Sequence, residues 1–515
     1  MVKKGRKSSG FLSVIERGGN ALPHPASLFG ILALSVLVLS LLGYLFSWNA
    51  VHPATGETVK TINLLSKDGL HRILLEMVDN YTSFAPLGIV MVALLGIGIA
   101  ESSGLIGAGI RYLVAKSPAR MITFVVVMAG IISNIASDLG YVLIIPLGGI
   151  IFHSVGRHPI AGIAAAFAGV SGGFSANLLI GTIDPLLAGL STEAARIIDP
   201  EYYVLPTANY YFMVISTIIL SLAGTWVTHR FVEPKLGKYE GDVPADALEK
   251  LSAKEKKGLK WVLATTVIIF AVIAAGLIPE NGILRGPDGT LFTSPILKGF
   301  IAVLFVVAAI LGIIFGVITG KFKNDADVVK GMVDNFKTLA AFLVLVFFAA
   351  QFVAFFKWSN LGLIIAIKGA DGLQSIDMGL IPLAILFILL SGFINMFMGS
   401  ASAKWAILGP VFIPMFMLMG YSPELSQVVY RIGDSITNMI SPMMSFFALI
   451  IVYFEKYDKK AGIGTLMSTM LPYTTVFFIF WSILLVGWIL LNLPLGPGAG
   501  LYYGYHDPAK KKRLW

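Results

Sequence analysis

The chain has 515 residues, of which 56% are hydrophobic and only 13% are charged. Soluble globular proteins carry about 25% charged residues, so this composition predicts a protein that lies in a lipid bilayer. The net charge of +9 comes from short basic clusters between apolar segments. That distribution is typical of cytoplasmic loops and argues against a nucleic-acid-binding surface.

Nine segments are long and apolar enough to cross a bilayer as helices, since one crossing needs about 20 such residues. They are residues 26–48, 86–115, 159–189, 208–231, 260–278, 296–320, 336–356, 423–452 and 467–493. Two more apolar stretches, 119–154 and 376–420, each carry a small polar cluster near the middle and have arms that are mostly short for a full crossing. We expect each to enter and leave the membrane on the same side. The predicted fold is an all-α polytopic membrane protein with about nine transmembrane helices plus two re-entrant helical hairpins.

The basic clusters predict the orientation, because cytoplasmic loops are enriched in Lys and Arg. With both hairpins re-entrant, nearly all basic loops fall on one side, together with a cytoplasmic N-terminal segment, 1–25, and a cytoplasmic Lys-rich linker, 232–259. The C-terminal tail, 494–515, is the exception, since its basic cluster at 510–513 falls on the outside.

The order of the segments predicts an inverted repeat. Two spans, a hairpin and two spans make up residues 26–231, and the same series recurs in 296–493 after a connecting span and loop, 260–295. The single connecting span makes the second copy start from the opposite face, as in many secondary transporters. The hairpin tips also match, because Tyr141 and Trp405 are each followed five residues later by a proline. Chance similarity of Gly- and Pro-punctuated helices is the alternative.

One span in each half is predicted to be broken. In the first half, the run 172–177 ends in Asn177 and is followed by 181–185; in the second, the run 431–438 ends in Asn438 and is followed by Ser441 and Pro442. Interrupted backbone at membrane depth is tolerated only where it faces protein or a water-filled cavity. Paired broken segments therefore point to the binding site.

Asp434 is the first candidate within that site. A carboxylate in the membrane centre costs about 2.5–3.5 kcal/mol on insertion scales, so it normally has a partner and a function. Asp434 and Asn395, with freed carbonyls, offer hard oxygen ligands for Na⁺, or Asp434 carries a proton. The alternative is a structural pair between Asp434 and Arg431, three residues earlier on the same helix face.

Two further aspartates have open roles. Asp184 precedes Pro185 and is either a proton carrier or the cap of the helix that follows. Asp138, at the first hairpin tip, is either an ion ligand or a helix cap. The second arm of each hairpin should point its N-terminus, which favours anions, toward the centre. With Lys404 and Trp405 nearby, an aromatic carboxylate would suit the site, although the Trp could equally serve packing.

Signatures of other function classes are missing. The sequence has no cysteine, no P-loop, no HExxH and no GxSxG motif, so we expect neither an enzyme nor a cofactor beyond a coupling ion. It also lacks an Arg-repeat helix and a TVGYG-like filter. A channel-like uniporter and a membrane-embedded enzyme remain as alternatives from other classes.

The sequence closely resembles the p-aminobenzoyl-glutamate transporter (AbgT) family along nearly its whole length. The resemblance rests on Leu22-Pro23-His24-Pro25, Phe84-Ala85-Pro86-Leu87-Gly88, Gly156-Arg157-His158-Pro159, Ala168-Gly169-Val170-Ser171-Gly172-Gly173, Ala176-Asn177-Leu178, Ala350-Gln351-Phe352-Val353-Ala354, Gly399-Ser400-Ala401-Ser402-Ala403-Lys404-Trp405, Tyr430-Arg431-Ile432-Gly433-Asp434-Ser435 and Leu493-Pro494. So many ordered matches are far more specific than any single motif.

The resemblance implies a homodimer of nine-span protomers in the bacterial inner membrane. It implies import of p-aminobenzoyl-glutamate or export of sulfonamides, which mimic its p-aminobenzoate part. The family's functional positions fall on Asp184, Asn395, Ser402, Trp405, Pro423, Arg431, Asp434 and Pro442. We therefore expect a carrier driven by H⁺ or Na⁺ that works by alternating access.

Overall fold

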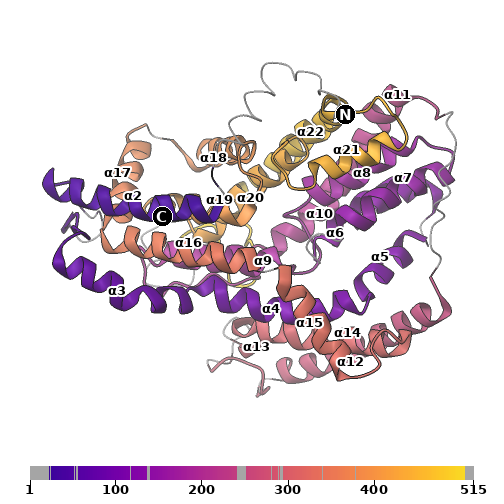
Figure 1. Cartoon of the computed structure of the whole chain (residues 1–515), viewed down its shortest axis with the longest axis horizontal. Coiled ribbons are helices and arrows are strands. Elements are labelled where there is room, and N and C mark those ends of the chain that lie inside the picture. Colours follow the sequence, from indigo (N-terminus) through magenta and orange to yellow (C-terminus); the bar gives the residue numbers. More distant parts are fainter. Residues whose placement is uncertain are drawn as a thin grey trace, which may run out of the picture.

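The computed structural model describes residues 23, 25–51, 53, 56–115, 118–135, 140–239, 251–279, 281–287, 289, 294–338, 340–376 and 378–504. The described part is almost entirely helical (Figure 1). Its first part contains α2 (Pro25–Leu45), strands β1 (Asn49–Val51) and β2 (Thr58–Lys60), α3 (Lys67–Thr82), α4 (Ala85–Ser102), α5 (Leu105–Ala115), η1 (Ala119–Met121), α6 (Ile122–Ser133), η2 (Gly140–Ile144), α7 (Ile145–Ser154), α8 (Pro159–Phe167), η3 (Ala168–Gly172), α9 (Ile183–Ala195), α10 (Tyr210–Val227), η4 (Thr228–Val232) and α11 (Glu233–Leu236). Its second part contains α12 (Ala253–Leu277), α13 (Pro295–Lys298), α14 (Phe300–Thr319), α15 (Asp325–Thr338), α16 (Ala340–Trp358), α17 (Leu361–Ser375), α18 (Leu380–Asn395), α19 (Ala401–Leu418), α20 (Pro423–Asn438), α21 (Phe447–Glu455) and α22 (Ile463–Leu490).

Seven helices of the described part are long and apolar enough to cross a membrane, or eight if the bent pair α15–α16 counts as one span. The predicted class, an all-α polytopic membrane protein, is confirmed. The prediction of nine spans stays a prediction. Two of the predicted spans, 159–189 and 423–452, are divided into pieces too short to be counted, and 336–356 is counted only as part of the bent pair. The count in turn includes α19, which was predicted as an arm of the second hairpin.

The two predicted hairpin stretches each fold as two helices with a short break. In 119–154 they are α6 and α7, the latter preceded by the π-helical turn η2, and in 376–420 they are α18 and α19. Which face each hairpin enters from stays a prediction, as do the domain boundaries. Asp138 lies outside the described residues, so its role stays open.

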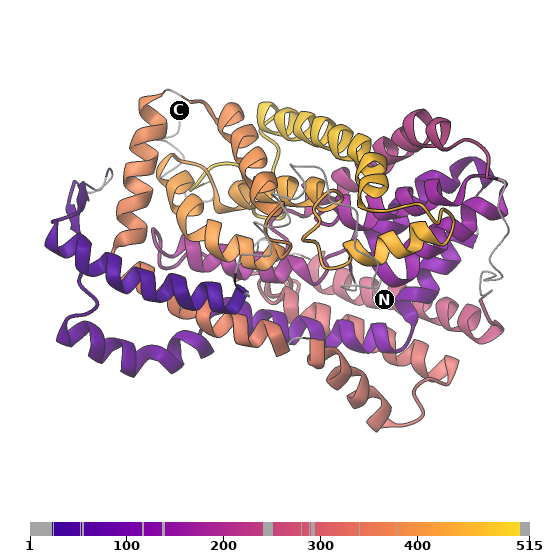
Figure 2. The same ribbon diagram turned by 45° about the horizontal axis from the view of Figure 1, so that its top comes forward.

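The two halves pack against each other reciprocally. Helices α2 and α3 of the first half pack on α16 of the second, while α14 and α15 of the second pack on α4 of the first. Figure 1 shows α4 beside α14 and α15, and the turned view in Figure 2 again places the indigo α2 against the orange α16. An inverted repeat would produce this exchange of partners, so the packing favours the predicted repeat.

Helices α3 and α15 were not predicted, because their charged residues interrupt the apolar runs on which the span prediction depended. Each carries several acidic and basic side chains, such as Arg72 and Glu76 in α3, which form an exposed ion pair of 3.0 Å. These polar helices therefore fold beside a membrane-spanning neighbour of the opposite half.

A glycine brings the first arm of each hairpin against the broken span of its own half. A Cβ at Gly169 would lie 2.2 Å from the carbonyl oxygen of Val127 in α6, and a Cβ at Gly433 would lie 2.3 Å from that of Ile388 in α18. Because real Cβ atoms do not approach backbone so closely, both contacts require glycine. Gly433, which lies in the run predicted to be broken, serves here in close helix packing.

Replacing Gly433 with alanine is expected to destabilise the protein by about 1–3 kcal/mol, because overpacking forces α18 and α20 apart. The matched control is Gly487→Ala in α22, where a Cβ would meet nothing within 4 Å. The measurement is the Tm of the purified protein in detergent. An unchanged Tm for Gly433→Ala would show that the two helices separate at no cost.

Candidate functional site

The breaks in the two halves differ in position. In the first half, non-helical residues 173–182 separate η3 from α9, as the glycine-rich sequence suggested. In the second half, α20 continues without interruption to Asn438, and the break covers 439–446, including Pro442. Of the segment predicted to be broken, the run 431–438 is therefore continuous helix, whereas Ser441 and Pro442 lie in the break. Arg431 and Asp434 both lie on this continuous helix, whose polar side chains have partners in neighbouring elements.

Arg431 forms an ion pair with Asp184 across the two halves. Its Nη2 lies 2.6 Å from Oδ1 of Asp184 and donates a second bond of 3.2 Å to the carbonyl of Ser175. Oδ2 of Asp184 accepts the backbone N–H of Gly181 at 2.7 Å. Both charged side chains are at most 3% exposed. Asp184 thus closes the broken segment before α9 and binds the arginine of the opposite half.

Asp434 pairs with Lys404 instead of Arg431. Oδ1 of Asp434 lies 2.5 Å from Nζ of Lys404, and both side chains are at most 1% exposed. The proposed intrahelical pair between Arg431 and Asp434 is therefore not formed, because each residue of α20 has a partner on a different element. Oδ2 of Asp434 is buried without a hydrogen-bond partner among the described residues.

Asn395 completes this second cluster. Its Oδ1 accepts a hydrogen bond from Lys404. Its Nδ2 lies 2.8 Å from the carbonyl oxygen of Asp434, from Oγ1 of Thr437 and from Oδ1 of Asn438. The two residues predicted to hold Na⁺, Asn395 and Asp434, are thus neighbours, and the ammonium group of Lys404 contacts an oxygen of each. Among the described residues, no group of three or more His, Cys, Asp or Glu side chains forms a metal site.

Trp405 is fully buried and packs within the protein. Its ring stacks on Tyr430 with centroids 4.5 Å apart, and its Nε1 donates to Oγ of Ser191 in α9 at 2.9 Å. Oγ of Ser191 in turn donates to Oε1 of Gln427 at 2.7 Å. In this conformation the geometry therefore favours the packing alternative for Trp405 over a ring presented to a ligand.

A small cavity of about 150 Å³ lies where the hairpins and the breaks meet. Its lining residues are Tyr141, Phe174, Gly399, Ala401, Asn438, Met444, Ser445 and Phe446. The rings of Tyr141 and Phe446 stack with centroids 4.4 Å apart. Ala401, the first residue of α19, lines the cavity, so the N-terminus of that helix faces it. Ser402 follows, with its Oγ 3.3 Å from the capping residue Ser400.

Other predicted residues lie farther out. Asn177 binds the carbonyl of Ile131 at the end of α6 and accepts the amides of the next two residues. Pro423 is the first residue of α20, about 16 Å along the helix from Asp434 at 1.5 Å per residue. Their part in binding stays a prediction.

The sequence analysis missed a polar stripe on α20. Glu424, Gln427, Arg431, Asp434 and Asn438 follow one another at spacings of three and four residues and are all buried. This period places them on one helix face. A search of the sequence for polar residues at this helical period would have identified Glu424 and Gln427 as well.

Comparison with known proteins agrees with this architecture. Residues 10–503 match the model of the AbgT putative transporter family. The p-aminobenzoyl-glutamate transport protein of Escherichia coli K12 is 39% identical over 485 residues, covering 94% of this chain and 95% of that protein. Relatives carry the names of transport proteins and efflux pumps, not of enzymes.

Two solved structures are similar over their whole length. The YdaH transporter of Alcanivorax borkumensis superimposes with a TM-score of 0.88 at 45% identity, covering 92% of this chain and 100% of that one. MtrF of Neisseria gonorrhoeae, described with a class of antimetabolite efflux pumps, gives a TM-score of 0.90 at 49% identity, covering 95% and 100%.

Breaking the Asp184–Arg431 pair is expected to destabilise the protein strongly. Asp184→Leu or Arg431→Met alone leaves a buried charge without a partner, which costs about 3–5 kcal/mol. The double variant removes both charges and should regain most of the lost Tm. Lys337→Met, in the exposed pair with Asp334, is the control and should leave Tm unchanged. A double variant no more stable than the worse single variant would contradict this prediction.

Proposed function

The chain belongs to the AbgT putative transporter family, and from this premise we propose that it is a secondary active transporter of p-aminobenzoyl-glutamate and an exporter of sulfonamide-type antimetabolites. The name of the Escherichia coli relative supports the first substrate. The description of the Neisseria structure supports antimetabolite efflux. H⁺ or Na⁺ drives the transport by alternating access.

The observation that carries this proposal is a pair of buried ion pairs held by one helix. Through Arg431, α20 binds Asp184 of the first half, and through Asp434 it binds Lys404 of the second hairpin. Four charges inside an apolar protein are costly, and such groups mark substrate and ion pathways in membrane proteins. Ala401 and Asn438, on the same helices as Lys404 and Asp434, line a cavity formed by both hairpins and both breaks. Inverted-repeat transporters bind substrate where their repeats meet.

Cation binding and substrate binding are coupled because the cation replaces Lys404 as the partner of Asp434. In the present arrangement Lys404 neutralises Asp434. A proton or Na⁺ bound at Asp434, with the Oδ1 of Asn395 as a further ligand for Na⁺, releases the lysine ammonium. The released lysine and the N-terminus of α19 then offer positive charge to a substrate carboxylate. Occupancy by the cation thereby changes the affinity for substrate.

The cavity must change shape during the cycle. Its volume of about 150 Å³ is below the ~300–1,000 Å³ typical of small-molecule sites. Opening toward one side at a time, through movement of the hairpin tips and the stacked rings of Tyr141 and Phe446, gives alternating access. We further propose that the protein acts as a homodimer in the bacterial inner membrane with a cytoplasmic N-terminus.

A second candidate function is an ion-independent uniporter for small aromatic carboxylates. Lys404 already neutralises Asp434 without any added ion, and this observation favours a permanent structural pair. Such a uniporter would move substrate down its own gradient only.

Flux of labelled p-aminobenzoyl-glutamate and of a sulfonamide in proteoliposomes, under separate Na⁺ and pH gradients, distinguishes the two candidates. We expect flux to follow one gradient, and we expect Asp434→Asn and Lys404→Met to abolish that dependence. The control is Lys368→Met, an exposed lysine on α17, which should transport normally. Efflux driven by an inward cation gradient identifies antiport, and uptake identifies symport. Gradient-independent flux unaffected by Asp434→Asn would establish the uniporter.

A further inference from the structure

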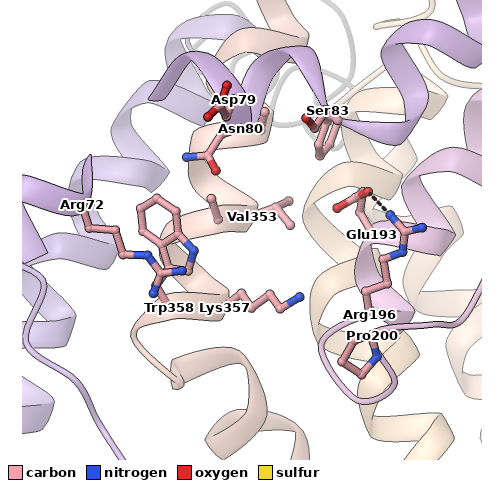
Figure 3. A pocket seen from close by; sticks show the side chains of 13 residues that line it. Arg72, Asp79, Asn80, Ser83, Glu193, Arg196, Pro200, Val353, Lys357 and Trp358 are labelled. Atoms are coloured by element: carbon pink, nitrogen blue, oxygen red, sulfur yellow. Dashed lines mark hydrogen bonds and ion pairs between the residues drawn. The ribbon is translucent and has the colours of Figure 1, made fainter. Parts of the chain in front are cut away.

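A second, larger cavity lies between α3, α9 and α16, away from the central site. Its volume is about 470 Å³, within the range of small-molecule sites. Figure 3 shows side chains from all three helices around this space. Phe84, Ala350 and Val353, which are all buried, form part of its apolar wall.

The lining carries charged side chains of both signs. Three cations, Arg72, Arg196 and Lys357, face two carboxylates, Asp79 and Glu193. In Figure 3, Lys357 extends from α16 toward the wall formed by α9, on which Arg196 reaches up to Glu193. Because Arg72 is paired with Glu76, Lys357 and Arg196 are the cations that a bound carboxylate would engage.

Two of these cations, Arg196 and Lys357, can form further hydrogen bonds or ion pairs. Nη1 of Arg196 is 3.1 Å from Glu193, but its buried Nε has no hydrogen-bond partner among the described residues. Lys357 is exposed and forms no ion pair with a described residue, while it interacts with Glu193 at longer range. By contrast, Arg72 is held by Glu76 at 3.0 Å and lies over the ring of Trp358 at 4.3 Å.

Helix α9 connects this cavity to the central site. Asp184, which binds Arg431, lies in its first turn, and Glu193 lies nine residues on, about 13 Å along the axis. Between them, Ser191 contacts Trp405 and Gln427. The two sites therefore occupy opposite ends of one short helix.

The predicted topology places the cavity on the outer face. Helix α3 follows the first outward span. Lys357 directly follows the span 336–356, which begins near the basic cytoplasmic loop at 321–330. Arg196 and Pro200 belong to the connection between α9 and α10, on the same side. The cavity thus lies opposite the cytoplasmic linker 232–259.

We infer that the cavity between α3, α9 and α16 is a peripheral binding site for a small aryl carboxylate, held by Lys357 and Arg196 at the outer end of the transport path. The inference rests on the proposed function for the identity of the ligand. The apolar wall suits the aryl body, and the two cations suit its carboxylate.

Equilibrium binding of labelled p-aminobenzoyl-glutamate to the full-length protein in nanodiscs tests the site. We expect two bound molecules per chain, and we expect Lys357→Gln and Arg196→Gln each to weaken one of them about tenfold or more, as loss of a charge-assisted hydrogen bond does. Lys357→Arg should retain binding, and the exposed Lys368→Gln should change nothing. We expect the Tm of both pocket variants to stay unchanged. A lowered Tm in both would indicate that the two side chains have a purely structural role.

The outcomes separate this inference from the proposed function. One bound molecule per chain, with an affinity that neither pocket variant alters, overturns the peripheral site while leaving transport intact. Absence of any binding, together with absence of flux in proteoliposomes, overturns both.

The absence of native cysteine allows a second test that also reports the side of the membrane. Ser83→Cys introduces a single thiol into the cavity wall, and Thr82→Cys places one at the neighbouring exposed position, which is not part of that wall. A membrane-impermeant maleimide added outside should label both, and p-aminobenzoyl-glutamate should slow labelling only at position 83. Labelling of Ser83→Cys only from the cytoplasmic side, or without protection by the ligand, overturns the inference.

Discussion

The structure depends on how four buried charges are neutralised inside an apolar protein. Burying an unpaired charge in such surroundings has a prohibitive free-energy cost. Even in a buried ion pair, desolvation cancels much of the electrostatic attraction. Helix α20 resolves this by turning Arg431 and Asp434 toward different neighbours, so that one pair joins the two halves and the other joins the second hairpin to the second broken span. The two pairs thereby connect α20 to α9 and to α19.

Composition and apolar runs were sufficient to predict the class of protein and the two stretches that each fold as a pair of helices. The partners within the site could not be predicted. Spacing along a helix favours a bond between Arg431 and Asp434. It gives no information about contacts with Asp184 and Lys404, because these residues belong to other helices. The continuity of the helix through 431–438 was also not predicted, because a glycine such as Gly433 can weaken a helix or allow close helix packing, and only the distance to Ile388 shows that it allows packing here.

The halves share their architecture but differ in chemistry. If Tyr141 corresponds to Trp405, then Gly140 corresponds to Lys404. A Cβ at Gly140 would lie 2.2 Å from Oγ of Ser133 and within 3 Å of Val170, so no long side chain fits there without rearrangement. The first hairpin therefore contributes close packing and an aromatic ring, while the second contributes the cation. Among the described residues of the two hairpins, the buried ion pair is thus built on the second one.

The pairing of Lys404 with Asp434 also has an electrical consequence. Each central pair sums to zero charge, so movement of either pair through a bilayer field displaces no net charge of these four groups. Since each elementary charge moved across 100 mV changes the energy by about 2.3 kcal/mol, the two pairs add nothing to any dependence of the protein on membrane voltage.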